Sequence, residues 1–253
     1  MRIVVLTSLP RPALLPDDFL PCELRRQGIP VTAIVARQLS LRGALRLHHG
    51  ERVRRLGRVA TSLWKRAAET QHSREPDWAP IPVHYVKDHN SPMAADRIRA
   101  LRPDLLVLGG TGIIGRQILE IPRLGTLGCH YALLPGLRGV DVTEWALFLD
   151  APVGVCIFWV DAGVDTGDVV VQRRIEVLPG ETLVQLRRRS AETGKELFVE
   201  AIRNIMHDTA VRLPQSAASE QYFAMHPRLV ELVERKLGEG RSTPVSARES
   251  RNA

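Results

Sequence analysis

The sequence predicts an α/β fold with a mainly parallel, twisted sheet. Short apolar runs rich in β-branched residues recur along the chain, and stretches with helical periodicity separate several of them. Strands that alternate with helices pair in parallel, because a crossover helix returns the chain to the same end of the sheet. The runs that predict strands are residues 2–7, 31–36, 83–87, 104–108, 126–130, 153–160 and 168–175.

Helical patterns predict the connecting segments. Asp17–Gln27 precedes a closing glycine, and Met93–Leu101 and Thr143–Leu149 carry apolar residues at helical spacing. Thr182–His207 predicts a long helix for the same reason. A turn-rich strip and a short amphipathic helix are expected after it.

The predicted organisation is one α/β domain, residues 1–206, and a C-terminal extension of helix and turns, residues 207–253. The polar tail from residue 238 is expected to be disordered. An arginine-rich insert at residues 37–79 interrupts the domain. A solvated surface helix is the favoured interpretation of this insert, and binding of an anionic ligand or an acidic membrane surface is the alternative.

Composition narrows the class of protein. The three cysteines show no CxxC spacing, so neither a disulfide framework nor a metal site is expected. No apolar run is long enough for a membrane helix, and a cytoplasmic protein is expected. The net charge of +7 would suit nucleic acid, but charge alone does not make that partner the favoured one.

A glycine-rich loop follows the predicted strand at residues 104–108. Gly110-Thr111-Gly112-Ile113-Ile114-Gly115 matches the GxGxxG pattern that holds a pyrophosphate in dinucleotide-binding proteins. The surroundings do not fit, because Pro122 ends the next helix early and the strand at 126–130 lacks the terminal acid that would bind a ribose. The glycines are instead expected to shape a tight loop against another flat ligand.

A histidine ends the strand at 126–130, in the stretch GCHYALLPGLRG that begins at Gly128. By itself, His130 is more often a structural residue than a catalyst. A second loop, from Asp161 to Asp168, places carboxylates and glycines between two apolar runs. An aspartate near the histidine would orient its ring and stabilise its protonated form.

Together these stretches resemble the folate-dependent formyltransferases, which act on glycinamide ribonucleotide, methionyl-tRNA or amino sugars. Their signature is Asn-x-His-x-Ser-x-Leu-Pro-x-x-x-Gly, followed by Asp-x-Gly-x-Asp-Thr-Gly. His130 with ALLPGLRG, then TEWAL, then DAGVDTGDVVVQ, is similar to it. The resemblance covers residues 80–206 well and the N-terminal strands loosely. It implies a Rossmann-like formyltransferase fold and an enzyme that uses N10-formyl-tetrahydrofolate.

The resemblance also implies roles for particular residues. His130 matches the catalytic histidine, which moves a proton as an amine attacks the formyl carbon, and Asp165 matches the aspartate that orients this histidine. Two loops match the backbone segments that hold the pterin. These loops are Gly112, Ile113, Ile114 and Gly115, and Asp161, Ala162, Gly163 and Val164.

The chain departs from the signature at the catalytic asparagine, which is Gly128, and at the serine, which is Ala132. Loss of one oxyanion donor typically lowers a rate by about 10²–10³. The family members that hold a phosphate use a glycine-rich first turn, whereas Leu9-Pro10-Arg11-Pro12 offers few backbone donors. Glycinamide ribonucleotide is therefore not expected as the substrate. The residues after the long helix are also too few for the barrel of the tRNA enzyme.

The leading hypothesis is formyl transfer to the amine of a small biosynthetic substrate, either an amino sugar, which can be nucleotide-linked, or an amino-acid derivative. A second hypothesis keeps the fold and changes the reaction to another acyl transfer or a hydrolysis, because Gly128 would open space beside His130. A third is a non-catalytic module that binds RNA or a protein partner. No membrane partner is expected, and a homodimer is an open alternative.

Overall fold

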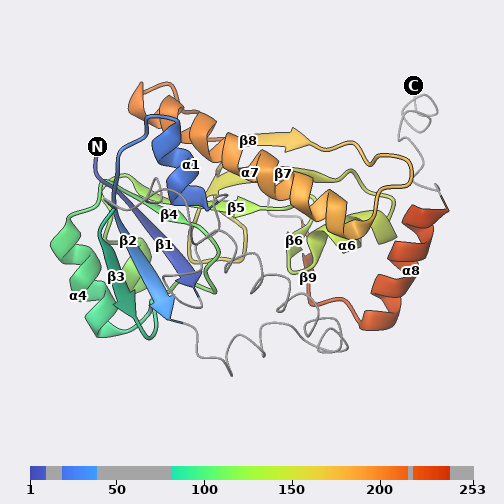
Figure 1. Ribbon diagram of the computed structural model, residues 1–253, viewed down its shortest axis with the longest axis horizontal. Coiled ribbons are helices and arrows are strands. Elements are labelled where there is room, and N and C mark those ends of the chain that lie inside the picture. Colours follow the sequence, from blue (N-terminus) through green and yellow to red (C-terminus); the bar gives the residue numbers. More distant parts are fainter. Residues whose placement is uncertain (10–18, 39–80, 216–218, 240–253) are drawn as a thin grey trace, which may run out of the picture. The chain divides into compact units, whose positions relative to one another are not determined.

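The computed structural model describes residues 1–9, 19–38, 81–215 and 219–239 (Figure 1). Nearly all of the expected basic insert at 37–79 and of the expected polar tail from 238 lies outside the described residues, as does most of the proline-containing first turn. The chain forms two compact units, Met1–Leu127 and Gly128–Ala253. The boundary between a 1–206 domain and its extension stays a prediction.

The first unit is built on parallel strands, which confirms the predicted fold class. Neighbouring strands follow the order β3-β2-β1-β4-β5, and each pair described is parallel. Apolar residues fill the two central strands β1 and β4 and are nearly all buried there, as expected where both faces of a parallel sheet are covered. The strands are β1 (Ile3–Leu9), β2 (Val31–Gln38), β3 (Val83–Val86), β4 (Leu105–Leu108) and β5 (Gly125–His130), whose last three residues belong to the second unit.

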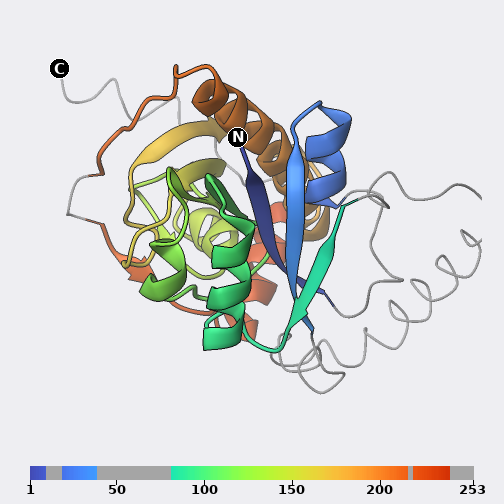
Figure 2. The same ribbon diagram turned by 90° about the vertical axis from the view of Figure 1, so that its left-hand side faces the viewer.

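Helices α1 (Leu20–Arg26) and α4 (Pro92–Leu101) cover opposite faces of this sheet (Figure 2). Chain direction explains the arrangement: α1 connects β1 to β2 and α4 connects β3 to β4, so the two crossovers run in opposite directions across the sheet. Right-handed crossovers in opposite directions place their helices on opposite faces. Ala94 and Ile98 of α4 are fully buried in the cluster beneath it.

The second unit continues from β5 through β7 (Gly154–Trp159) to β8 (Val169–Arg174), and β7 and β8 pair antiparallel. The long helix α7 (Leu183–Met206) packs along both strands (Figure 1). Two further helices contact each other, α6 (Val142–Phe148) and α8 (Pro227–Gly238). A small parallel pair joins β6 (Arg138–Gly139) to β9 (Gln221–Tyr222).

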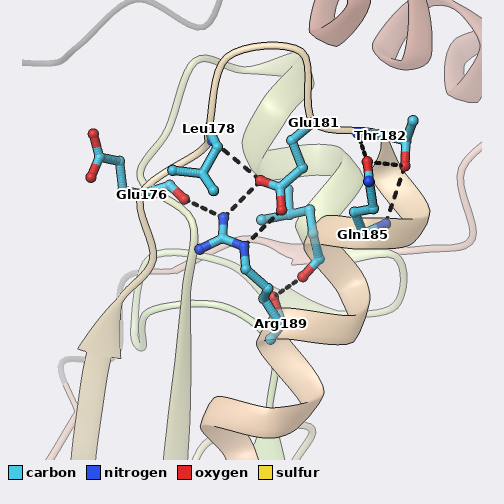
Figure 3. A network of polar contacts seen from close by, with 8 residues as sticks. Glu176, Leu178, Glu181, Thr182, Gln185 and Arg189 are labelled. Carbon is cyan, nitrogen blue, oxygen red and sulfur yellow. Dashed lines mark hydrogen bonds and ion pairs between the residues drawn. The ribbon is translucent and has the colours of Figure 1, made fainter.

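A polar network fixes the start of α7 (Figure 3). The Thr182 hydroxyl accepts a hydrogen bond from the main-chain amide of Gln185, and the side-chain oxygen of Gln185 accepts one from the main-chain amide of Thr182. This reciprocal pair is a capping box. Arg189 donates two hydrogen bonds to the Glu181 carboxylate and one to the Glu176 carbonyl. The Glu181 side chain is therefore buried with its charge paired.

Candidate active site

His130 stands at the end of β5, where the strand enters the loop towards β6. The residue is 5% exposed, and its ring meets Phe158 edge to face. Its Nε2 lies 2.8 Å from the Leu137 carbonyl oxygen, and its Nδ1 lies 3.5 Å from Oδ2 of Asp165. A carbonyl oxygen only accepts, so Nε2 carries a proton and donates it in this arrangement. Both ring nitrogens thus face acceptors of the protein.

Asp165 is held from several sides. Its Oδ2 accepts a hydrogen bond of 2.9 Å from the Gly139 amide, which belongs to the loop that also bonds His130. Its backbone φ of 53° is left-handed, a conformation that aspartate tolerates better than most residues. The sequence-predicted pair of His130 and Asp165 is therefore brought together within the second unit.

The loop that presents Asp165 is closed by its own side chains. Asp161 accepts hydrogen bonds from the Gly163 amide at 3.0 Å and the Thr166 hydroxyl at 2.5 Å. A Cβ atom at Gly167 would overlap the Trp159 carbonyl, so only glycine lets the loop approach β7 this closely. The predicted pterin-binding residues of this loop, Asp161, Ala162, Gly163 and Val164, are all exposed.

Gly128 lies two residues before the histidine on β5, and the space at its Cα is filled. A Cβ atom here would lie 2.8 Å from Cγ2 of Val160 and 3.0 Å from Cε1 of Phe158. Both distances are shorter than ordinary carbon contacts. The expectation that Gly128 opens space beside His130 is wrong, because the side chains of Val160 and Phe158 occupy that space.

The other predicted pterin-binding loop, Gly112–Gly115, belongs to the first unit. It leads into α5 (Arg116–Leu119), a single turn and even shorter than the sequence suggests. Ile113 is 87% exposed, whereas Ile114 is buried. The loop is therefore anchored by one isoleucine and presents the other.

Asn90 fastens this loop, and sequence reasoning did not find it. Its side chain donates to the Ile113 carbonyl at 2.9 Å and accepts from the Gly115 amide at 2.6 Å. Gln117 donates to the Asn90 carbonyl. The turn-forming stretch Asp88-His89-Asn90 was the signal available, but it could not show which loop Asn90 contacts.

Two residues near the pair were also missed, Arg138 and Gln215. The Arg138 side chain is buried and donates to Oε1 of Gln215, whose amide group donates to the carbonyls of Asp165 and Gly167. No motif marks Gln215, which lies far along the chain in the turn-rich strip. The site thus includes part of the predicted C-terminal extension.

The cysteines near the pair are not poised as nucleophiles. Burial raises the pKa of the Cys129 thiol to about 12 and the pKa of the Cys156 thiol still further. A thiol is nucleophilic as the thiolate. Neither thiol is therefore available as a nucleophile near neutral pH.

Known proteins share sequence and fold with this chain. The formyl transferase family model matches residues 60–202, more than half of the chain. The chain belongs to the formyl transferase family. This confirms the suspected family and the expected class of enzyme, a transferase, and the family uses N10-formyl-tetrahydrofolate. Within the described ranges, no helix has the length and hydropathy needed to cross a membrane.

Individual relatives differ in what they act on. Methionyl-tRNA formyltransferase of Methylacidiphilum infernorum is 36% identical over 142 residues, which is 55% of this chain and 44% of that protein. The chain spans less than half the length of the curated relatives it matches.

Solved structures share this fold over most of the chain. Glycinamide ribonucleotide transformylase 1 from Symbiobacterium toebii has a TM-score of 0.58 at 22% identity, over 85% of this chain and 94% of that one. The formyltransferase PseJ from Anoxybacillus kamchatkensis, in complex with UDP-4,6-dideoxy-4-formamido-L-AltNAc and tetrahydrofolate, has a TM-score of 0.53 at 20% identity, over 96% and 95%.

Proposed function

We propose that this chain transfers a formyl group from N10-formyl-tetrahydrofolate to the primary amine of a small biosynthetic substrate. The single observation that carries the proposal is the placement of His130 between Asp165 and the Leu137 carbonyl, in a chain of the formyl transferase family. A histidine held in this way can accept a proton and return it, which is what amine acylation requires.

His130 acts as the general acid and base. The lone pair of the amine forms the new C–N bond, the bond between the formyl carbon and the donor nitrogen breaks, and one proton passes from the amine to that nitrogen. His130 takes this proton and returns it, so the enzyme ends unchanged. Because Nε2 donates to Leu137, one of the two contacts of the ring must open for the transfer. Asp165 orients the ring and stabilises the cationic form during the transfer.

The residues present suit the folate donor. The exposed residues Asp161–Val164 lie in a short loop closed by its own side chains, and the loop Gly112–Gly115 is held by the side chain of Asn90. Segments of this kind can offer amides and carbonyls to a flat heterocycle. The bound donor supplies the activated formyl group.

A small amine is the preferred acceptor because the structure of PseJ, which contains a nucleotide sugar, shares its fold with 96% of this chain. A second candidate acceptor is methionyl-tRNA, favoured by the identity to the tRNA enzymes and by the net charge of +7. Although the sequence alone does not favour nucleic acid as a partner, methionyl-tRNA is therefore included as one arm of the test.

The test mixes purified protein and N10-formyl-tetrahydrofolate with UDP-linked amino sugars, with amino-acid derivatives or with methionyl-tRNA, and follows the tetrahydrofolate released. We expect amine-dependent release with a small amine and its loss in His130→Asn. Release with methionyl-tRNA alone would assign the second acceptor, and formate release without any amine would indicate hydrolysis. No turnover together with no folate binding by calorimetry would overturn the proposal.

A further inference from the structure

The segment that follows α7 lies across the ends of β7 and β8. Leu213 exchanges two backbone hydrogen bonds of 2.9 Å with Val169 at the start of β8. One residue earlier, the Arg212 guanidinium carbon lies 4.0 Å from the ring centroid of Trp159 in β7, a cation–π contact. These contacts fix the approach of Gln215 to the loop between the two strands.

The Gln215 side chain joins the two loops that hold His130. Its Nε2 donates to the Asp165 carbonyl at 3.1 Å and to the Gly167 carbonyl at 2.6 Å. Its Oε1 accepts from Nη2 of Arg138 at 2.8 Å and from Nε at 3.3 Å. An amide offers two donor hydrogens and two acceptor lone pairs, and this geometry uses all four.

The contacts form a closed circuit through the histidine. From Gln215 the path runs to Asp165, then to the His130 ring, then to the Leu137 carbonyl, and back through Arg138 to Gln215. Because Gln215 bonds both the Asp165 loop and the Arg138 loop, it limits how far these two loops can separate. An amide does not titrate, so this restraint holds over the whole pH range in which the histidine works.

We propose that Gln215 is a positioning residue, which holds the Asp165 loop and the Arg138 loop at the spacing that keeps the carboxylate facing His130. The C-terminal segment would then be part of the active site rather than an appendage. The role in catalysis rests on the proposed function. Gln215 touches neither substrate nor reacting atoms in this role, and the predicted pterin-binding residues Asp161–Val164 are held by the hydrogen bonds of Asp161 itself, so loss of Gln215 should affect proton transfer more than donor binding.

Three variants test it in the full chain. Gln215→Leu removes all four hydrogen bonds, while Gln215→Glu keeps the acceptor for Arg138 and loses both donors. Trp145→Phe is the matched control, since it removes one other hydrogen bond to the same segment, from Nε1 of Trp145 to the Phe223 carbonyl at 2.8 Å. Each variant is assayed for kcat, for KM of N10-formyl-tetrahydrofolate and for thermal stability.

We expect kcat to fall roughly ten- to a hundred-fold in Gln215→Leu, with KM for the donor within about two-fold, because misplacement of a catalytic group costs rate more than binding. The kcat of Gln215→Glu should fall by a similar factor, and the kcat of Trp145→Phe should stay within about two-fold of the wild type. A kcat loss in Gln215→Leu no larger than that of Trp145→Phe would overturn the proposal.

A second readout does not need turnover. Nitrogen-15 spectra of the His130 ring should show changed Nδ1 and Nε2 shifts in Gln215→Leu and unchanged shifts in Trp145→Phe. Unchanged shifts in Gln215→Leu would overturn the positioning role even if the wild type proved inactive. Absence of turnover in the wild type, with altered shifts in Gln215→Leu, would overturn the proposed function and leave the circuit intact.

Discussion

Asp165 and His130 face each other at 3.5 Å, and the same carboxylate accepts a hydrogen bond from the amide of Gly139. The loop whose Leu137 carbonyl accepts the hydrogen bond from His130 Nε2 therefore also donates, through Gly139, to the aspartate that faces Nδ1. One local rearrangement would disturb both contacts of the ring. This coupling makes the aspartate an informative position to change.

Asp165→Asn should lower kcat by about 10²–10⁴ and leave the fold intact. Asparagine fits the left-handed backbone and can still accept from Gly139, but it removes the negative charge that stabilises a protonated His130. The measurement is steady-state kinetics with the amine identified as the acceptor. Asp208→Asn is the control, since Asp208 has the same left-handed backbone, with φ of 57° against 53°, and lies beyond α7. Equal activity of the two variants would contradict the assigned role of Asp165.

Asn90→Asp should weaken binding of the folate donor about ten-fold, with a smaller effect on kcat. The aspartate can still accept from the Gly115 amide, but it cannot donate to the Ile113 carbonyl and places charge against it. Calorimetric titration with tetrahydrofolate gives the dissociation constant. Asn204→Asp, a change of the same kind in α7, should leave that constant unchanged, and an equal loss in both variants would argue against the loop as a folate contact.

Much of this arrangement could be predicted from the sequence. The parts that could not be predicted have one physical cause in common. The runs that became strands carry their periodicity within a few residues, and His130 and Asp165 belong to motifs with fixed spacing. Gln215 reaches Arg138 across 77 positions of sequence, and β6 pairs with β9 through two residues on each strand. Contacts between residues so far apart in sequence, or between segments so short, leave no periodic pattern in the sequence. The filled space at Gly128 depends likewise on cross-strand neighbours that packing alone reveals.

Glu181→Gln should lower the free energy of unfolding by about 1–2 kcal/mol at pH 7. Hydrogen bonds from Arg189 hold the pKa of the Glu181 carboxyl below its usual range. A carboxyl whose pKa is lower in the folded state stabilises the protein above its unfolded pKa, about 4.3, and this contribution is lost as the pH falls through the folded pKa. The difference between variant and wild type should therefore shrink below about pH 4.3.

Urea unfolding at several pH values measures this difference. Glu176→Gln is the matched control, because Glu176 accepts a hydrogen bond from Arg189 through its main-chain carbonyl and its carboxylate acts on Arg189 through charge alone (Figure 3). The control should lose less stability than Glu181→Gln at pH 7. A gap between Glu181→Gln and wild type that stays constant down to the lowest pH would contradict the assignment of the charge pair.

Gly128→Ala should destabilise the protein by about 1–3 kcal/mol, as overpacked side chains in a core usually do. The added methyl group would meet Val160 and Phe158, and a second change, Val160→Ala, removes the closest of these atoms. The double variant should therefore lose less stability than the sum of the single variants, which denaturant unfolding can measure. Gly238→Ala, where no atom lies within 4 Å of the new Cβ, should change stability by less than about 0.5 kcal/mol.

The same packing predicts how the site responds to the amide that the family places here. Gly128→Asn should not raise formyl transfer, because the asparagine cannot be seated without displacing Val160 or Phe158, and Phe158 also supports the His130 ring. Higher turnover in Gly128→Asn with unchanged stability would contradict this. If turnover falls as expected while the wild type is active, groups other than a side chain at position 128 stabilise the formyl oxygen in this protein. The packing of Val160 and Phe158 then requires glycine at this position.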